Sequence, residues 1–81
     1  PFNPTTTIAY TLQKATDVTL TVYNMIGQEV KMLVNEKMGA GAHSVQWDGT
    51  NAADQKVVSG IYFYKLETEN MSQIKKMVMV K

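Results

Sequence analysis

The sequence contains no cysteine and no arginine, and only two of its 81 residues are proline. Without cysteine the chain forms neither disulfides nor thiolate metal sites, so packing and strand pairing must stabilise it. Without arginine it lacks the side chain that makes bidentate contacts to bases, and its formal net charge is only +1. Nucleic acid is therefore not an expected partner.

Long apolar runs are also absent. No stretch approaches the roughly 18 apolar residues of a membrane-spanning helix, and the chain does not start with the basic and apolar segments of a signal peptide. The composition, 44% apolar and 19% charged, is that of an ordinary folded domain. A chain of 81 residues has room for one domain with a thin core.

Residues 1–5 differ from the rest of the sequence. Pro1 and Pro4 favour extended backbone and supply no amide hydrogen, which is typical of a linker that leads into a domain. The chain also starts inside this segment and without methionine, which indicates a fragment of a longer protein. We therefore predict that residues 1–5 end an interdomain linker and that residues 6–81 form the folded domain.

Alternating apolar and polar residues, separated by turn residues, predict a series of short strands. The strands are expected at residues 8–12, 18–23, 29–34, 43–47, 61–66 and 73–81. Leu33 and Val34 break the alternation, which predicts a bulge or a strand end covered on both faces. A helix over residues 28–38 is the alternative. Six or seven short strands of this spacing predict an all-β antiparallel sandwich of about seven strands.

Particular residues are expected to shape this sandwich. Trp47 is predicted to be the largest core side chain, and residues 61–66 are predicted to form a central strand. In the turn before residue 29, Gly27 can take a positive φ and Asn24 can accept hydrogen bonds from its own backbone. Six methionines are spread through the chain and are expected to fill gaps in the core or lie exposed.

No group of residues supports catalysis. His43, Ser44 and Asp48 are the residue types of a hydrolytic triad, but adjacent residues of a strand point to opposite faces, so His43 and Ser44 cannot readily meet. No nucleophile motif surrounds Ser44 or Ser59. We expect no enzyme activity and no cofactor.

A polar loop at residues 48–54 is the best candidate for a metal site. Asp48, Asn51 and Asp54 carry the oxygens that Ca²⁺ prefers, but the ligand spacing of an EF-hand is missing. The favoured interpretation is that Asp48 and Asn51 accept hydrogen bonds from backbone amides and hold the turn. With one histidine and no cysteine, a zinc site has even less support.

Aromatic and basic side chains suggest possible binding surfaces. Tyr62 and Tyr64 either form an exposed aromatic face or lie in the core with a hydroxyl bonded to a corner of the backbone, and we favour the second. The lysines near the end of the chain, Lys75, Lys76 and Lys81, could bind anionic lipid or polysaccharide. More often such lysines protect an edge strand from aggregation, although an edge strand as apolar as residues 77–80 could pair with another copy.

Five segments, taken in order, resemble one family. They read PFNPTT, VYNMIGQEV, HSVQWDGTN, SGIYFYKL and KKMV. The chain resembles the type A C-terminal sorting domain of proteins that leave the cell through the type IX secretion system. The immunoglobulin-like domain of the flagellar hook-capping protein shares much of this pattern. Asp54 stands where the sorting domains usually have a turn glycine, and Lys56 where they often have proline.

The resemblance implies an immunoglobulin-like sandwich over residues 6–81 that serves as a non-catalytic, C-terminal sorting signal. Its expected partners are the outer-membrane secretion translocon and sorting machinery, with a catalytic or adhesive domain upstream in the same chain. The expected location is outside a Gram-negative cell or on its surface, reached through the periplasm. The recognised surface is hypothesised to comprise the last strand and two turns, with Gly27, Gly60, Lys75, Lys76 and Lys81.

Two other functions fit the same features. One is a structural immunoglobulin-like assembly domain of the hook-capping type. The other is a carbohydrate-binding module attached to a secreted enzyme, which would need a solvent-facing row of flat aromatic side chains, whereas Trp47 is predicted to be buried.

Overall fold

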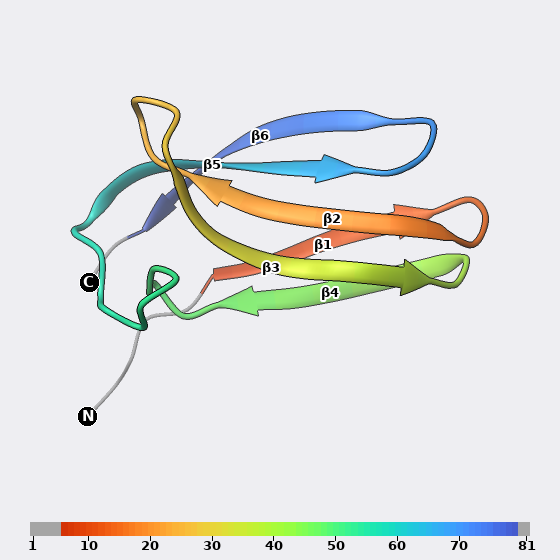
Figure 1. Cartoon of the computed structure of the whole chain (residues 1–81), viewed down its shortest axis with the longest axis horizontal. Helices are drawn as coiled ribbons and strands as arrows, with labels where there is room; N and C mark the ends of the chain where they lie inside the picture. The colour runs from red at the N-terminus through yellow and green to blue at the C-terminus, as the bar shows by residue number, and fades with distance from the viewer. Residues whose placement is uncertain (1–5, 80–81) are drawn as a thin grey trace.

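The computed structural model describes residues 6–79, which form two antiparallel β-sheets packed against each other (Figure 1). β1 pairs with β4 in a two-strand sheet, and a four-strand sheet has the order β3-β2-β5-β6. The strands are β1 (Thr6–Leu12), β2 (Thr16–Tyr23), β3 (Glu29–Met38), β4 (Gly41–Trp47), β5 (Gly60–Glu67) and β6 (Ser72–Met79). The predicted all-β antiparallel sandwich is confirmed, with six strands in the described part instead of about seven. The linker predicted over residues 1–5 lies outside that part.

Side chains from both sheets form the core. In β1 the burial alternates as predicted, so that Ile8, Tyr10 and Leu12 point inward. β2 turns Val18, Leu20 and Val22 inward, because a strand turns successive side chains to opposite faces, but Thr21 on its other face is buried as well. Trp47 is fully buried at the end of β4, and its ring lies edge-on to the ring of Tyr62, with the centroids 5.1 Å apart. Trp47 is therefore the largest core residue, as predicted.

β3 is a strand with two irregularities. Leu20 lies opposite Val34 and Thr21 lies opposite Met32, which leaves Leu33 as an extra residue on β3. The bulge predicted at Leu33 and Val34 is confirmed. The alternative of a helix over residues 28–38 is wrong, because β3 pairs with β2 as far as Met38. The strand is longer than predicted because this pairing also orders its polar end.

The turn between β2 and β3 depends on two residues. The side-chain oxygen of Asn24 accepts hydrogen bonds from the backbone amides of Ile26, at 3.1 Å, and Gln28, at 2.9 Å. Gly27 has a φ of 85°, in the region that favours glycine. Both roles were predicted from the sequence.

β5 lies inside the four-strand sheet, as predicted, and β6 lies at its edge. The inward residues of β6 are Met77 and Met79, whereas Ile74 and Val78 point outward and are exposed. The last strand was predicted over residues 73–81, and its final two residues are outside the described part. Residues 6–79 contain no helix that could cross a membrane.

Candidate interaction surfaces

The polar loop after β4 is held by its own side chains. Asp48 accepts two hydrogen bonds from Thr50, one from the amide at 3.1 Å and one from the hydroxyl at 2.6 Å. The side-chain oxygen of Asn51 accepts hydrogen bonds from the amides of Ala53, at 2.9 Å, and Gln55, at 3.0 Å. These bonds are the ones predicted for Asp48 and Asn51.

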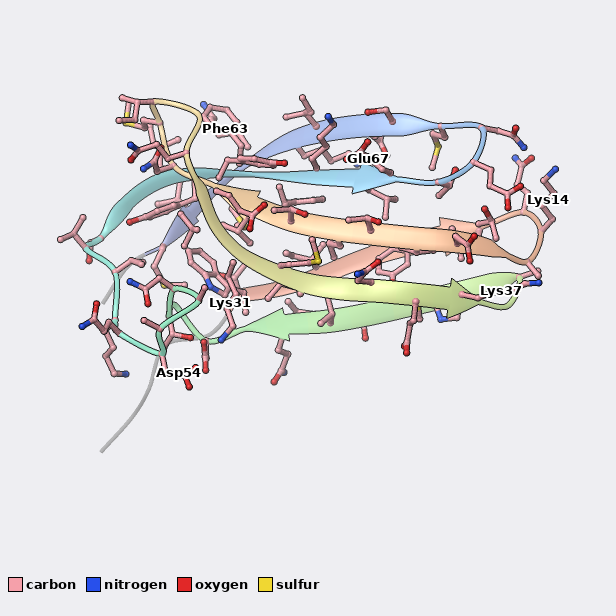
Figure 2. The ribbon with its side chains drawn as sticks, in the orientation of Figure 1. Lys14, Lys31, Lys37, Asp54, Phe63 and Glu67 are labelled. Atoms are coloured by element: carbon pink, nitrogen blue, oxygen red, sulfur yellow. The ribbon has the colours of Figure 1, made fainter. Side chains whose placement is uncertain are left out.

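A lysine from β3 supplies a positive charge to this loop. The Nζ atom of Lys31 donates a hydrogen bond of 2.8 Å to the Thr50 hydroxyl and lies 3.5 Å from a carboxylate oxygen of Asp54 (Figure 2). The Thr50 hydroxyl, and to a smaller extent Lys31, lower the pKa of Asp48 below its ordinary value. The loop is therefore fastened to β3 by an ammonium group from this chain.

The calcium hypothesis for Asp48, Asn51 and Asp54 stays a prediction. Two of these side chains accept the hydrogen bonds described above, and Asp54 is paired with Lys31. Among residues 6–79, no three histidine or acidic side chains gather in a group that could hold a metal ion.

The three residue types of a hydrolytic triad do not form one. His43 lies opposite Tyr10, and the two rings stack with centroids 5.6 Å apart. The ring nitrogen Nε2 of His43 lies 2.7 Å from the carbonyl oxygen of Gly39. Ser44 lies opposite Ala9, on the other face of the two-strand sheet.

Tyr62 has the corner contact expected of a core tyrosine. Its hydroxyl donates a hydrogen bond of 2.7 Å to the carbonyl oxygen of Val58, four residues earlier in the chain, and its side chain is buried. Tyr64 is half-buried against the core. The core interpretation is therefore confirmed for Tyr62, whereas Tyr64 packs against the core with part of its surface exposed.

Two turns that are distant in sequence meet at one end of the sandwich. Residues 24–26 and 58–62 line a shallow groove of about 270 Å³. Met25, Ile26 and Val58 stand beside it with 67%, 78% and 76% of their surface exposed. Gly60 lines the groove, and Gly27 lies in the same turn as Met25. The two turns were predicted from the sequence, but the role of their apolar side chains was not. The one sequence signal for these side chains is that apolar residues stand beside turn glycines.

The other residues of the hypothesised recognition surface do not share one face. Lys75 lies opposite Tyr64, whereas Lys76 lies opposite Phe63. Since Tyr64 points toward the core, Lys75 is on the inner side of the four-strand sheet and Lys76 is on its outer side. Both lysines are exposed. Lys81 lies outside the described residues.

Comparison with known proteins identifies relatives of this fold. The sequence pattern of the FlgD Ig-like domain matches residues 3–72. The solved structure of FlgD from P. aeruginosa superimposes with a TM-score of 0.74 at 21% identity, over 93% of this chain and 58% of that one. The solved structure of FlgD from Xanthomonas campestris, whose description concerns hook capping essential for flagellar assembly, superimposes with a TM-score of 0.72 at 22% identity. The match covers 95% of this chain and 56% of that one. No curated protein matches.

These findings correct one prediction and leave another without support. The predicted route through the periplasm to the cell surface by type IX secretion is wrong, because the matching family is the FlgD Ig-like domain. No match supports a type IX sorting domain. The residues that suggested one, such as Asn24, Gly27 and Trp47, hold turns and core together. These residues therefore indicate the fold and not the route of export.

Proposed function

This chain belongs to the FlgD Ig-like domain family, and on that premise we propose that it is a non-catalytic assembly domain of the hook-capping type. The observation that carries the proposal is the family match over residues 3–72. The chain spans a little more than half the length of the solved FlgD chains, so a role in flagellar assembly is part of the proposal. The domain would act by binding other protein subunits.

The contact surface that we propose is the end formed by residues 24–28 and 58–62, around Gly27 and Gly60. It combines a shallow groove with three strongly exposed apolar side chains, Met25, Ile26 and Val58. Apolar side chains gathered at one place on a small domain favour a protein interface. The occupant would be a protein subunit of the hook assembly.

In-frame deletion of residues 6–79 from the parent protein, in the organism that encodes it, tests the function. We expect cells without complete hooks, seen by electron microscopy, and a loss of swimming. A plasmid copy of the intact protein should restore both. Normal hooks and motility in the deletion strain would refute the proposal.

A pair of point variants tests the surface. Ile26→Asp should reduce hook assembly, because it places a charge in the apolar contact. Ile74→Asp is the matched control, since Ile74 is also exposed, at 62% against 78%, but lies on β6. Both variants should keep the unfolding midpoint of the native domain. Equal loss of assembly in the two variants would place the contact elsewhere.

A further inference from the structure

The outer face of the four-strand sheet carries a row of side chains with opposite charges at its two ends. β1 and β4 cover the inner face of this sheet (Figure 1). On the outer face, Tyr23 of β2 lies opposite Glu29 of β3 and also opposite Phe63 of β5. Phe63 lies opposite Lys76 of β6, which points outward. Since opposite residues share a face, the row runs from an acid through two aromatic rings to a base.

The charges at the two ends of the row cannot pair within one chain. β3 and β6 are the edges of the sheet, with β2 and β5 between them, so roughly 14 Å separates the two edge strands. Glu29 and Lys76 are both exposed. Neither side chain forms an ion pair or a hydrogen bond with another of residues 6–79.

The other charges of the outer face occur as pairs of opposite sign. Asp17 of β2 lies opposite Lys37 of β3. The Nζ atom of Lys65 lies 3.7 Å from a carboxylate oxygen of Glu67, its neighbour on β5. Among the outward residues of these four strands, the charges at the ends of the row are therefore the two that have no opposite charge beside them.

Apolar side chains continue the row toward the turn between β2 and β3. Ile61 and Val78 lie opposite each other at the next outward positions of β5 and β6, and Val78 is 57% exposed. Met25 and Ile26 are strongly exposed in the turn itself. Phe63, which lies opposite the last residue of β2, is close to this turn (Figure 2). The aromatic centre of the row is thus part of a larger apolar surface.

On the other side of the row the apolar surface ends. The next outward residues of the two central strands are Thr21 and Lys65, which lie opposite each other and are polar. Ile74 lies beside Lys65 and therefore outside the apolar surface. The surface defined here, the outer patch, consists of the four residues of the row, residues 25–26, Ile61 and Val78.

The outer patch is complementary to itself under one two-fold rotation. Two copies that face each other across an axis parallel to their strands bring Glu29 of each copy opposite Lys76 of the other. The same rotation places the aromatic rings against each other and the turn of one copy over Val78 of the other. An axis perpendicular to the strands would bring equal charges together. The charges therefore select the first arrangement.

We infer that a second copy of this chain docks on the outer patch, so that two four-strand sheets pack face to face in a symmetric dimer. Sheets packed in this way keep their strand directions within about 30° of each other. The apolar side chains supply most of the affinity, and the two symmetric ion pairs fix the orientation. The inference rests on the proposed assembly function, for which it names a second copy as the partner.

Sedimentation equilibrium of the 81-residue chain tests the dimer. Between about 10 and about 500 µM, the apparent mass should rise from that of a monomer toward that of a dimer. Glu29→Lys and Lys76→Glu each bring like charges together at both symmetric positions, so each should raise the dissociation constant at least about tenfold. A chain that stays monomeric throughout, or a dimer that both variants leave intact, would overturn the inference.

Mixing the two variants tests the facing pairs directly. In a dimer of one Glu29→Lys copy with one Lys76→Glu copy, every facing pair again has opposite charges. An equal mixture should therefore dimerise with a dissociation constant within about threefold of the native value. The double variant should do the same alone. Failure of the mixture to dimerise would overturn the inference, because both copies retain the apolar surface and only the charge pairing differs.

Two control variants change side chains outside the outer patch. Lys75→Glu makes the same charge reversal on the inner side of β6, and Ile74→Asp places a charge beside Lys65. Both should leave the dissociation constant unchanged, whereas Ile26→Asp should raise it. Equal weakening by Lys75→Glu and Lys76→Glu would overturn the inference.

The dimer and the assembly function can fail separately. Sedimentation of the 81-residue chain does not depend on hook assembly. A monomeric chain that hooks still require would refute the dimer alone. A dimer in a chain that hooks do not require would refute the assembly function alone.

Discussion

Asp54 takes a backbone conformation that residues with a side chain rarely adopt. Its φ is 59°, and it is the one non-glycine residue with a positive φ among residues 6–79. Its carboxylate pairs with Lys31 but is 88% exposed, so that ion pair contributes little to stability. Glycine adopts this conformation without strain, whereas alanine does not.

The effect of replacing Asp54 on the free energy of unfolding should therefore depend on the backbone conformation and not on the lost charge. Asp54→Gly should be more stable than Asp54→Ala by about 1 kcal/mol, measured as the free energy of unfolding in urea. Both variants remove the carboxylate, so each serves as the other's control for the lost ion pair. Equal stability of the two would contradict the account of this turn.

Asp48 should make the stability of the domain depend on pH. Hydrogen bonding from Thr50 holds the folded-state pKa of Asp48 below its ordinary value of 3.8. Because the pKa of Asp48 is lower in the folded state than in the unfolded state, its ionised carboxylate stabilises the fold at pH values above the unfolded-state pKa. This stabilisation is lost as the pH falls through the folded-state pKa. Between about pH 5 and about pH 2, the free energy of unfolding should therefore fall more steeply in the native chain than in the Asp48→Asn variant. Identical pH profiles would contradict the assignment.

Residue roles could be predicted from the sequence where the contacts are local. Asn24, Asp48 and Asn51 each accept hydrogen bonds from residues at most four positions away. Their turns follow from side-chain length and backbone geometry. The contact of Lys31 with Thr50 spans 19 positions and could not be predicted, because it depends on how β3 lies beside the loop.

The side chain of Asn24 makes three hydrogen bonds within the turn between β2 and β3. Asn24→Ala removes the acceptor for the amides of Ile26 and Gln28 and the side-chain bond to Gln28. Because the turn is exposed, water replaces part of what is lost, and we expect a destabilisation of about 1 to 2 kcal/mol. The Asn24→Asp variant keeps the acceptor oxygen, so its free energy of unfolding in the same urea titration should fall by less. A larger loss in the aspartate variant would contradict this role.

The existence of the strands was clearer from the sequence than their ends or partners. The alternation in β1 and β2 predicted which apolar residues face the core, but it did not predict the burial of Thr21. The end of β3, from Asn35 to Met38, lacks such alternation and becomes strand because Thr16–Thr19 of β2 pairs with it. The opposite faces of Lys75 and Lys76 follow from strand geometry, but which face is inward depends on the packing of the whole sandwich.

At the scale of the whole molecule, Trp47 connects the two sheets and the loop after β4. It is buried at the end of the two-strand sheet, contacts Tyr62 of the other sheet, and donates a hydrogen bond of 2.9 Å to the carbonyl oxygen of Thr50. Trp47→Phe removes this bond and leaves a cavity, so we expect a loss of about 2 to 4 kcal/mol in the free energy of unfolding. A loss below about 1 kcal/mol would show that the core repacks without it.

The fold and the function differ in how far the sequence determines them. The sandwich follows from strand spacing and turn residues, which many small β-domains share. The groove at one end arises from segments brought together by the fold, residues 24–26 and 58–62. The expectation of type IX export failed because it relied on turn and core residues that describe the fold and not the partner.

The most direct test of the central claim is the position of the parent protein in the cell. Antibodies against residues 1–81, used for immunogold electron microscopy of cells that are building flagella, should label the distal ends of growing hooks. Such labelling, absent in the strain that lacks residues 6–79, is what an assembly domain of the hook-capping type requires. Gold spread over the cell surface, with none at hook tips, would contradict the claim.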